Sequence, residues 1–185
     1  MGEKRQARQG ADVLLQEEPL RFQTRKQVGL LGGNFNPVHL AHLVMADQVQ
    51  NQLGLDKVYL MPTYLPPHVD EKKTISSEHR LAMLELAVAD NPCLDIEPIE
   101  LIRKGKSYTY DTMKALKEAN PDTDYYFIIG GDMVEYLPKW HRIDDLLHLV
   151  QFVGIRRPNY PTESTYPIIW VDVPQMAISS RSEEH

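Results

Sequence analysis

The alternation of apolar and polar positions divides the chain into short apolar runs and segments with helical periodicity. The run QVGLLGG (27–33) is typical of a buried strand that ends in two glycines. From Val38 to Leu53, apolar residues recur at three- and four-residue steps, which predicts an amphipathic helix ended by Gly54. The run KVYLMP (57–62) predicts the next strand, and a proline-rich loop follows it.

The same alternation continues along the rest of the chain. Residues 76–90 predict a helix with Ser76 or Ser77 as its N-cap and with Leu81, Leu84 and Val88 on one face. The further elements expected are a strand or extended segment at 93–102, helices at 109–120 and 143–150, and strands at 124–132, 151–158 and 167–173. Strands that alternate with helices in this way indicate an α/β domain with a mostly parallel sheet.

Composition and charge narrow the class of protein. The 185 residues are 42% hydrophobic and 25% charged, which suits one globular domain with a sizeable core. The net charge of −6 argues against a broad nucleic-acid surface, although a local anion pocket remains open. Cys93 is the single cysteine, and neither a membrane span nor a signal core is evident, so we expect a reducing, cytoplasmic compartment. Residues 1–26 are expected to be a mobile polar leader before one domain at 27–185.

The segment GGNFNPVHLAH (32–42) concentrates the candidate chemistry. Asn36 suits an N-cap and Pro37 the first helical position, so we expect the helix to begin there. A helix N-terminus attracts anions, and His39 and His42 share one helical face, so both imidazoles can reach a phosphate held by the turn. The alternatives are a plain turn with two surface histidines, or a zinc site for which no third ligand is evident nearby.

Other phosphate-binding motifs do not fit. The segment GKS (105–107) would need a glycine at position 100 to form a P-loop, and that position holds Glu100. The dinucleotide pattern G-x-G-x-x-G is absent after the first strand. A hydrolase is disfavoured because no pair of nucleophile and base stands out.

Several motifs together resemble those of a known family. GGNFNPVHLAH is similar to the nucleotidyltransferase motif G-G-x-F-D-P-x-H-x-G-H. The segments PPHVDEKK, SSEHRLAML, KSYTYDTMKAL, DYYFIIGGDMVEYLPKW and ISS follow in the order found in bacterial nicotinate mononucleotide adenylyltransferases. The resemblance runs from about Gln27 to Ser180 and implies a Rossmann-like, doubly wound sheet with helices on both faces.

The resemblance also implies a reaction of NAD biosynthesis. The phosphate of nicotinate mononucleotide would attack the α-phosphorus of ATP in line, giving nicotinate adenine dinucleotide and pyrophosphate. Such chemistry needs positioning and charge stabilisation more than a protein base. Mg²⁺ would bridge the β- and γ-oxygens of ATP, with few protein ligands. Neither nucleic acid nor a membrane is an expected partner, and a homo-oligomer is left open.

The resemblance assigns roles to individual residues. His39 and His42 would contact the ATP phosphates and stabilise charge on the transferring and leaving groups. The remaining ATP contacts implied are Gly32, Gly33 and Asn34 near the α-phosphate, Gly130, Gly131 and Asp132 at the ribose, Ile155 and Arg156 near the adenine, and Ser179 and Ser180 facing the phosphates. For the nicotinate pocket they are Ser107, Tyr108, Thr109 and Asp111, with Trp140 stacked on the pyridine ring. Trp140 as a half-buried core residue and Asp132 as a helix cap are the simpler alternatives.

The sequence departs from the family pattern at several positions. Asn36 replaces an aspartate, Ala41 replaces the glycine between the histidines, and Val69 stands where many relatives carry a lysine. Glu184 stands where the family carries an arginine that clamps the ATP phosphates, so we expect the final helix to be lacking. The alternatives are therefore another mononucleotide or pantetheine-phosphate adenylyltransferase, or a nucleotide-binding module without catalysis.

Overall fold

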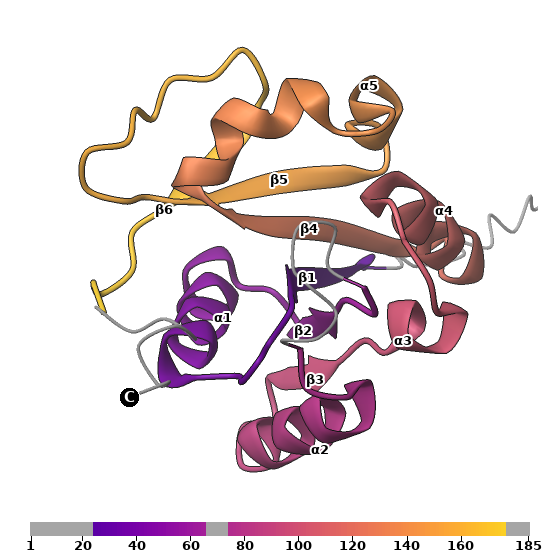
Figure 1. The fold of residues 1–185 in the computed structure, drawn as a ribbon. Coiled ribbons are helices and arrows are strands. Elements are labelled where there is room, and N and C mark those ends of the chain that lie inside the picture. The colour runs from indigo at the N-terminus through magenta and orange to yellow at the C-terminus, as the bar shows by residue number, and fades with distance from the viewer. Residues whose placement is uncertain (1–23, 66–73, 177–185) are drawn as a thin grey trace, which may run out of the picture.

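A single six-stranded sheet organises the protein. The computed structural model describes residues 24–65 and 74–176 (Figure 1). The strands are β1 (Lys26–Gly33), β2 (Lys57–Pro62), β3 (Leu94–Ile96), β4 (Thr123–Gly130), β5 (Val150–Ile155) and β6 (Ile168–Val171). All neighbouring pairs are parallel, and the order across the sheet is β3-β2-β1-β4-β5-β6. Within the described residues, no helix has the length and hydropathy needed to cross a membrane.

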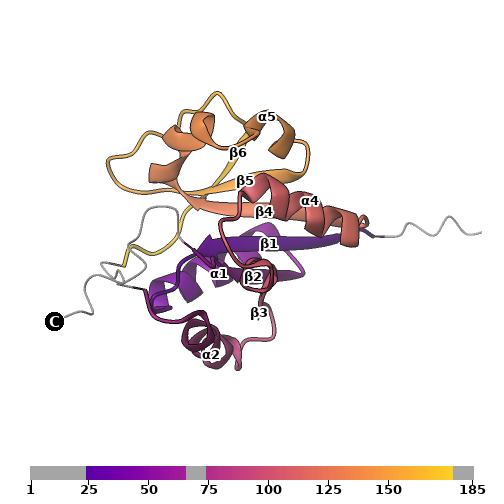
Figure 2. The ribbon, with the colours of Figure 1, turned by 45° about the vertical axis from the view of Figure 1, so that its right-hand side comes forward.

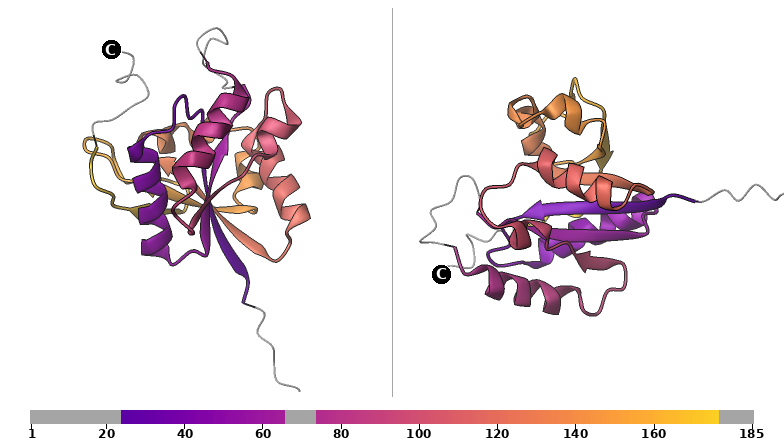
Figure 3. Two further views of the ribbon diagram at one scale, coloured as in Figure 1. Left: turned by 90° about the horizontal axis from the view of Figure 1, so that it is seen from below. Right: turned by 90° about the vertical axis from the view of Figure 1, so that its right-hand side faces the viewer.

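Helices pack on both faces of this sheet. They are α1 (Leu40–Leu53), α2 (Ser77–Val88), α3 (Ile99–Arg103), α4 (Thr109–Ala119), the 3₁₀ helix η2 (Gly131–Lys139) and α5 (Ile143–Leu146). Figure 2 shows the strands one below another, from β6 at the top to β3 at the bottom. The left-hand view of Figure 3 shows α1 and α4 on opposite sides of the strands, which fan out with the twist of the sheet. The two cores group α2 with α1 and α5 with α4.

Successive residues of the central strand belong to two separate cores. Leu30 packs with α4, η2 and α5, whereas Leu31 packs with α1 and α2. The side chains of a strand alternate between its faces, so a central strand covered on both sides needs apolar residues at consecutive positions. The predicted doubly wound α/β fold is confirmed, and its strand order reverses between β1 and β4, the place where such sheets bind ligands.

The first helix begins later than predicted. It starts at Leu40 with His39 as its N-cap residue, so the prediction of Asn36 as N-cap and Pro37 as first helical residue is wrong. The reason lies in Phe35, whose ring is buried and whose φ of 47° turns the chain before the helix can begin. The side chain of Asn36 instead accepts a hydrogen bond from the backbone N–H of Ile75 at 3.0 Å. The predicted end is confirmed, because Gly54 has a φ of 62°.

The second helix has the predicted cap and an unexpected buried residue. The hydroxyl of Ser76 accepts a hydrogen bond from the backbone N–H of His79 at 3.4 Å, so Ser76 rather than Ser77 is the N-cap. Leu84 and Val88 are buried as predicted. The third buried position of this helix is held by Arg80 and not by Leu81.

The remaining differences concern short elements. The segment 93–102 contains only the three-residue strand β3 and then α3, a helix that the sequence does not predict. Gly131 and Asp132 belong to η2 and not to the preceding strand. The helix expected at 143–150 ends at Leu146, since the chain enters β5 at Val150. The strands expected at 151–158 and 167–173 are shorter than predicted, and β1 starts at Lys26, one residue inside the expected leader.

Gly154 in β5 offers a test of this packing. A Cβ atom at Gly154 would lie 2.8 Å from Trp170 and 2.9 Å from Ile168, both in the neighbouring strand. We expect Gly154→Ala to lower the free energy of unfolding by about 1–3 kcal/mol, as overpacked cores do. Urea denaturation followed by circular dichroism measures this.

Gly32→Ala is the matched control in β1. Its Cβ would meet Phe127 at 3.5 Å, an ordinary van der Waals contact. We expect this variant to be unchanged or slightly more stable, because alanine restricts the unfolded chain. Equal destabilisation by both substitutions would contradict the packing described for Gly154.

Candidate functional site

The predicted phosphate-binding histidines lie in a cleft at the carboxyl edge of the sheet. This cleft has a volume of about 330 Å³. Its lining consists of His39, Ala41, His42 and Met45 from the start of α1, Ile155, Arg156 and Arg157 from the end of β5, and residues 173–176 beyond β6. The structure therefore brings together four of the residues expected to bind ATP, namely His39, His42, Ile155 and Arg156.

The two histidines form one stacked unit. Their ring centroids are 3.7 Å apart with an angle of 20° between the planes. The backbone N–H of His39 donates a hydrogen bond to Nδ1 of His42 at 3.2 Å, so Nδ1 must be unprotonated and the proton of neutral His42 must sit on Nε2. The edge of Phe35 meets the His42 ring at a centroid distance of 4.9 Å. These contacts fix the orientation of His42 and leave it with a single ring donor.

Burial keeps His42 neutral. Burial, and to a smaller extent the neighbouring charge of His39, lower the pKa of His42 from 6.5 to about 4. His42 therefore acts near neutral pH as a neutral hydrogen-bond donor and not as a cation.

The beginning of α1 adds positive potential to this cleft. This helix has 14 residues and no acidic residue in its first turn, so the partial positive charge of its N-terminus is not neutralised locally. Just before the turn, Oδ1 of Asn34 is buried and makes no hydrogen bond to any residue of the described segments.

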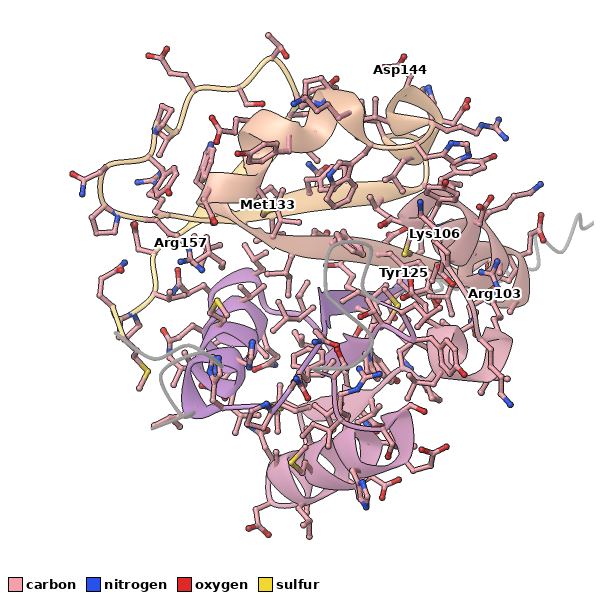
Figure 4. All side chains as sticks on the ribbon, viewed as in Figure 1. Arg103, Lys106, Tyr125, Met133, Asp144 and Arg157 are labelled. Atoms are coloured by element: carbon pink, nitrogen blue, oxygen red, sulfur yellow. The ribbon has the colours of Figure 1, made fainter. Side chains whose placement is uncertain are left out.

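A carboxylate marks the end of β4. Asp132, in the first turn of η2, forms an ion pair with Arg157, with Oδ1 and Nε 3.2 Å apart. A Cβ at Gly130 would lie 2.5 Å from this same oxygen, so the close approach of the carboxylate to the backbone requires a glycine. Asp132 is thus held at the edge of the sheet, and Figure 4 shows Arg157 between the end of β5 and α1.

The residues expected at the nicotinate pocket lie around the start of α4. The ring of Tyr108 is 4.5 Å from that of His141 between centroids, and Nζ of Lys106 lies 5.1 Å from the centroid of Tyr108. The guanidinium carbon of Arg142 lies 4.1 Å from the centroid of the buried Tyr110 ring. The segment Ser107–Asp111 is therefore adjacent to the residues that follow Trp140.

Trp140 itself is half-buried against the core. Its ring meets those of Phe127 and Phe152 edge-on, at centroid distances of 6.0 and 5.9 Å. The packing agrees with the simpler alternative of a core residue and leaves its stacking on a pyridine ring as a prediction.

Other expected residues are distributed unevenly over the structure. Gly32, Gly33 and Asn34 form the end of β1 and the turn beyond it, on the same edge of the sheet as Gly130 and Asp132. Ser179 and Ser180, together with Val69 and Glu184, lie outside the described residues.

Three residues near these sites were not predicted from the sequence, namely Arg157, His141 and Met45. The only signal for them was their place in or beside the motifs IRRP, PKWHR and HLAH. No group of three or more His, Cys, Asp or Glu side chains suited to a metal ion occurs in segments 24–65 and 74–176.

The lowered pKa of His42 predicts acid sensitivity of the fold. Unfolded His42 binds its proton near pH 6.5 and folded His42 only near pH 4, so acid favours the unfolded state. From about pH 7.5 to about pH 4.5, this residue alone should lower the free energy of unfolding by about 2.5 kcal/mol. Urea denaturation at both pH values should show His42→Asn losing less stability than the wild type by that amount. Asparagine retains an oxygen that can accept the N–H of His39.

His148→Asn serves as the control, since His148 is exposed. Its loss of stability on acidification should equal that of the wild type. An equal loss in the His42→Asn variant would show that His42 is charged in the folded protein.

Known proteins are similar to this one over most of its length. The profile of the cytidylyltransferase-like family matches residues 30–182. A Streptococcus pneumoniae protein named "Probable nicotinate-nucleotide adenylyltransferase" is 67% identical over 164 residues, which cover 89% of this chain and 78% of that protein. A Lactococcus lactis protein of the same name is 65% identical over 156 residues, which cover 84% of this chain and 80% of the relative.

The fold is also found in solved structures. The Plasmodium falciparum nicotinic acid mononucleotide adenylyltransferase complexed with NaAD superimposes with a TM-score of 0.72 at 19% identity, over 85% of this chain and 82% of that one. At 19% identity this match shows the fold alone. The family profile and the long, highly identical alignments decide the family: the chain belongs to the cytidylyltransferase-like family and, within it, to the nicotinate-nucleotide adenylyltransferases.

Proposed function

We propose that this protein transfers the adenylyl group of ATP to nicotinate mononucleotide in NAD biosynthesis, in the cytoplasm. A phosphate oxygen of the mononucleotide forms a bond to the α-phosphorus of ATP, and the bond from that phosphorus to the bridging oxygen of pyrophosphate breaks. The attacking phosphate is already ionised at neutral pH, so no protein base is needed. The observation that carries the proposal is the stacked pair His39–His42 at the start of α1, in a chain 67% identical to a protein named for this activity.

The phosphates of ATP are the ligands that the cleft suits best. Neutral His42 offers its Nε2–H as a fixed donor, and His39 stands beside it at the positive end of α1. Donors fixed before the reaction stabilise negative charge that develops on the transferring and leaving groups. We assign His39 and His42 to this role, with Gly32, Gly33 and Asn34 near the α-phosphate.

The remaining assignments concern the adenine, the ribose and the nicotinate ring. Ile155 and Arg156 would lie near the adenine, and Asp132 with Gly130 and Gly131 near the ribose hydroxyls, for which a carboxylate is a good acceptor. Ser107, Tyr108, Thr109 and Asp111 would surround the nicotinate ring, with Trp140 against it. Lys106 beside this segment favours an anionic acceptor, whereas Arg142 is already paired with Asp145, with Nε and Oδ2 2.7 Å apart.

Mg²⁺ enters this proposal as part of the nucleotide substrate. Asp132, the carboxylate at this edge, is already paired with Arg157. A hard cation without a cluster of protein carboxylates is best held by the β- and γ-oxygens of ATP.

A panel of acceptors tests the reaction and its alternatives. Purified protein is incubated with ATP, Mg²⁺ and either nicotinate mononucleotide, nicotinamide mononucleotide, 4′-phosphopantetheine or no acceptor, and pyrophosphate and dinucleotide are quantified. We expect both products with nicotinate mononucleotide and much less with nicotinamide mononucleotide, because the amide lacks the negative charge that Lys106 near Tyr108 would attract. Binding of ATP with no release of its pyrophosphate, whichever acceptor is present, would identify a nucleotide-binding module instead.

The role of His42 can be tested separately. We expect His42→Ala to lower kcat by about 10²-fold, the range seen when one transition-state donor is removed, with the fold intact by circular dichroism. The exposed His148→Ala should keep the wild-type rate. An unchanged rate in the His42 variant would remove this residue from the phosphate site.

A further inference from the structure

The turn between β1 and α1 contacts a buried arginine that has no role in the site described above. Arg80 of α2 has 1% of its surface exposed. Its guanidinium donates to four backbone carbonyls, with Nη1 bonded to Asn34 at 2.7 Å and to Thr63 at 2.8 Å. The other two bonds run from Nη2 to Tyr64 at 3.3 Å and from Nε to Ile75 at 3.2 Å.

These acceptors come from three separate segments. Asn34 belongs to the turn between β1 and α1, Thr63 and Tyr64 follow the end of β2, and Ile75 precedes α2. We propose that Arg80 is a positioning residue for adenylyl transfer, because it holds the β1–α1 turn against the two neighbouring segments and so fixes where His39 and His42 meet the phosphates. This inference rests on the proposed function.

The type of residue fits a fixed scaffold. A buried cation is costly unless its donors are satisfied, and burial lowers the pKa of Arg80 below its ordinary value. Only arginine offers a planar fork of donors that can bind carbonyls in several directions at once. An apolar residue of similar volume would serve packing alone, as Leu84 does one turn later on the same face.

The contact with Asn34 falls at the critical point of the turn. The bonded carbonyl belongs to the peptide that leads into Phe35, whose positive φ is unfavourable for a bulky side chain. Such a conformation persists only where its surroundings impose it. The Phe35 ring in turn contacts His42, so a rotation of this peptide would move the histidine.

Two further bonds join the same segments. The backbone N–H of Thr63 donates to Gly33 at 3.0 Å, and that of Ile75 donates to the side chain of Asn36 at 3.0 Å. Arg80 itself donates hydrogen bonds to all three segments. It is absent from the lining of the cleft that contains His39 and His42, so its influence on the reaction is indirect.

The test compares R80M, R80K and a matched control, L84A, from the same helix. Leu84 is fully buried in the core of α1 and α2, which also contains Phe35, so L84A weakens this packing but removes none of the hydrogen bonds that Arg80 makes to the turn. Each variant is assayed well below its melting temperature for kcat and for KM with ATP and nicotinate mononucleotide. The ring ¹⁵N signals of His42 are recorded by NMR in the same samples.

We expect R80M to lose about 10²-fold in kcat, as a misplaced catalytic group does, with the KM for nicotinate mononucleotide nearly unchanged. The Nδ1 signal of His42 should shift as its bond to His39 weakens. R80K should recover part of the rate, because an ammonium can still reach the carbonyls of Asn34 and Thr63. L84A should lose melting temperature but keep both kcat and the His42 signal.

Three results would overturn the proposal: a wild-type kcat in R80M, an equal loss of kcat in L84A, or an unmoved His42 signal in R80M. If R80M does not fold, R80K replaces it in each comparison. A kcat below that of the wild type together with a shifted His42 signal in R80K then supports the proposal, and wild-type values of either contradict it. Should the wild type form no dinucleotide, the proposed function fails, and the His42 signal of the Arg80 variants alone decides the positioning role.

Discussion

The parallel pairing of β1 with β4 joins two halves of the chain that are far apart in sequence. It runs from Lys26 beside Thr123 to Leu31 beside Ile128, at the centre of the sheet. β2 and β3 extend the sheet in one direction from this pair, and β5 and β6 in the other. Because parallel strands end at a common edge, the glycines after both apolar runs meet there, and the chain leaves β1 and β4 on opposite faces. The crevice that receives a ligand is a consequence of this one pairing.

The sequence predicts these central strands because their signal is local. A strand covered on both faces must be apolar at consecutive positions, as Leu30 and Leu31 are, and the run VGLL can be recognised without its partners. The same holds for α1 and α4, whose periodic apolar residues follow from burial of one face. The proximity of the two histidines was also predictable from their spacing, whereas the start of the helix was not, since His39 is the N-cap residue of α1.

Features that depend on distant partners were not predictable. Arg80 stands two residues after Glu78, which gives no sign that the arginine is buried, and its acceptors at Asn34, Thr63 and Tyr64 become neighbours only in the folded chain. The prediction of Asn36 as a cap failed for the same reason, because its side chain bonds to Ile75 and the buried ring of Phe35 sets the turn. The 3₁₀ helix η2 was missed since Pro138 and two glycines give no helical signal.

His42 presents a fixed, neutral hydrogen-bond donor to the cleft and not a mobile positive charge. Two imidazoles whose centroids are 3.7 Å apart cannot both be protonated cheaply, and burial keeps His42 neutral. Its donor strength then depends on orientation, which the N–H of His39 and the edge of Phe35 supply. A neutral donor needs no counter-ion and no reorganisation when charge develops on a phosphate oxygen, but it acts only over hydrogen-bond distance. In the proposed reaction, the contribution of His42 would therefore depend on how firmly the turn beneath it is held, so the buried side of the turn would matter as much as the side proposed to face the nucleotide.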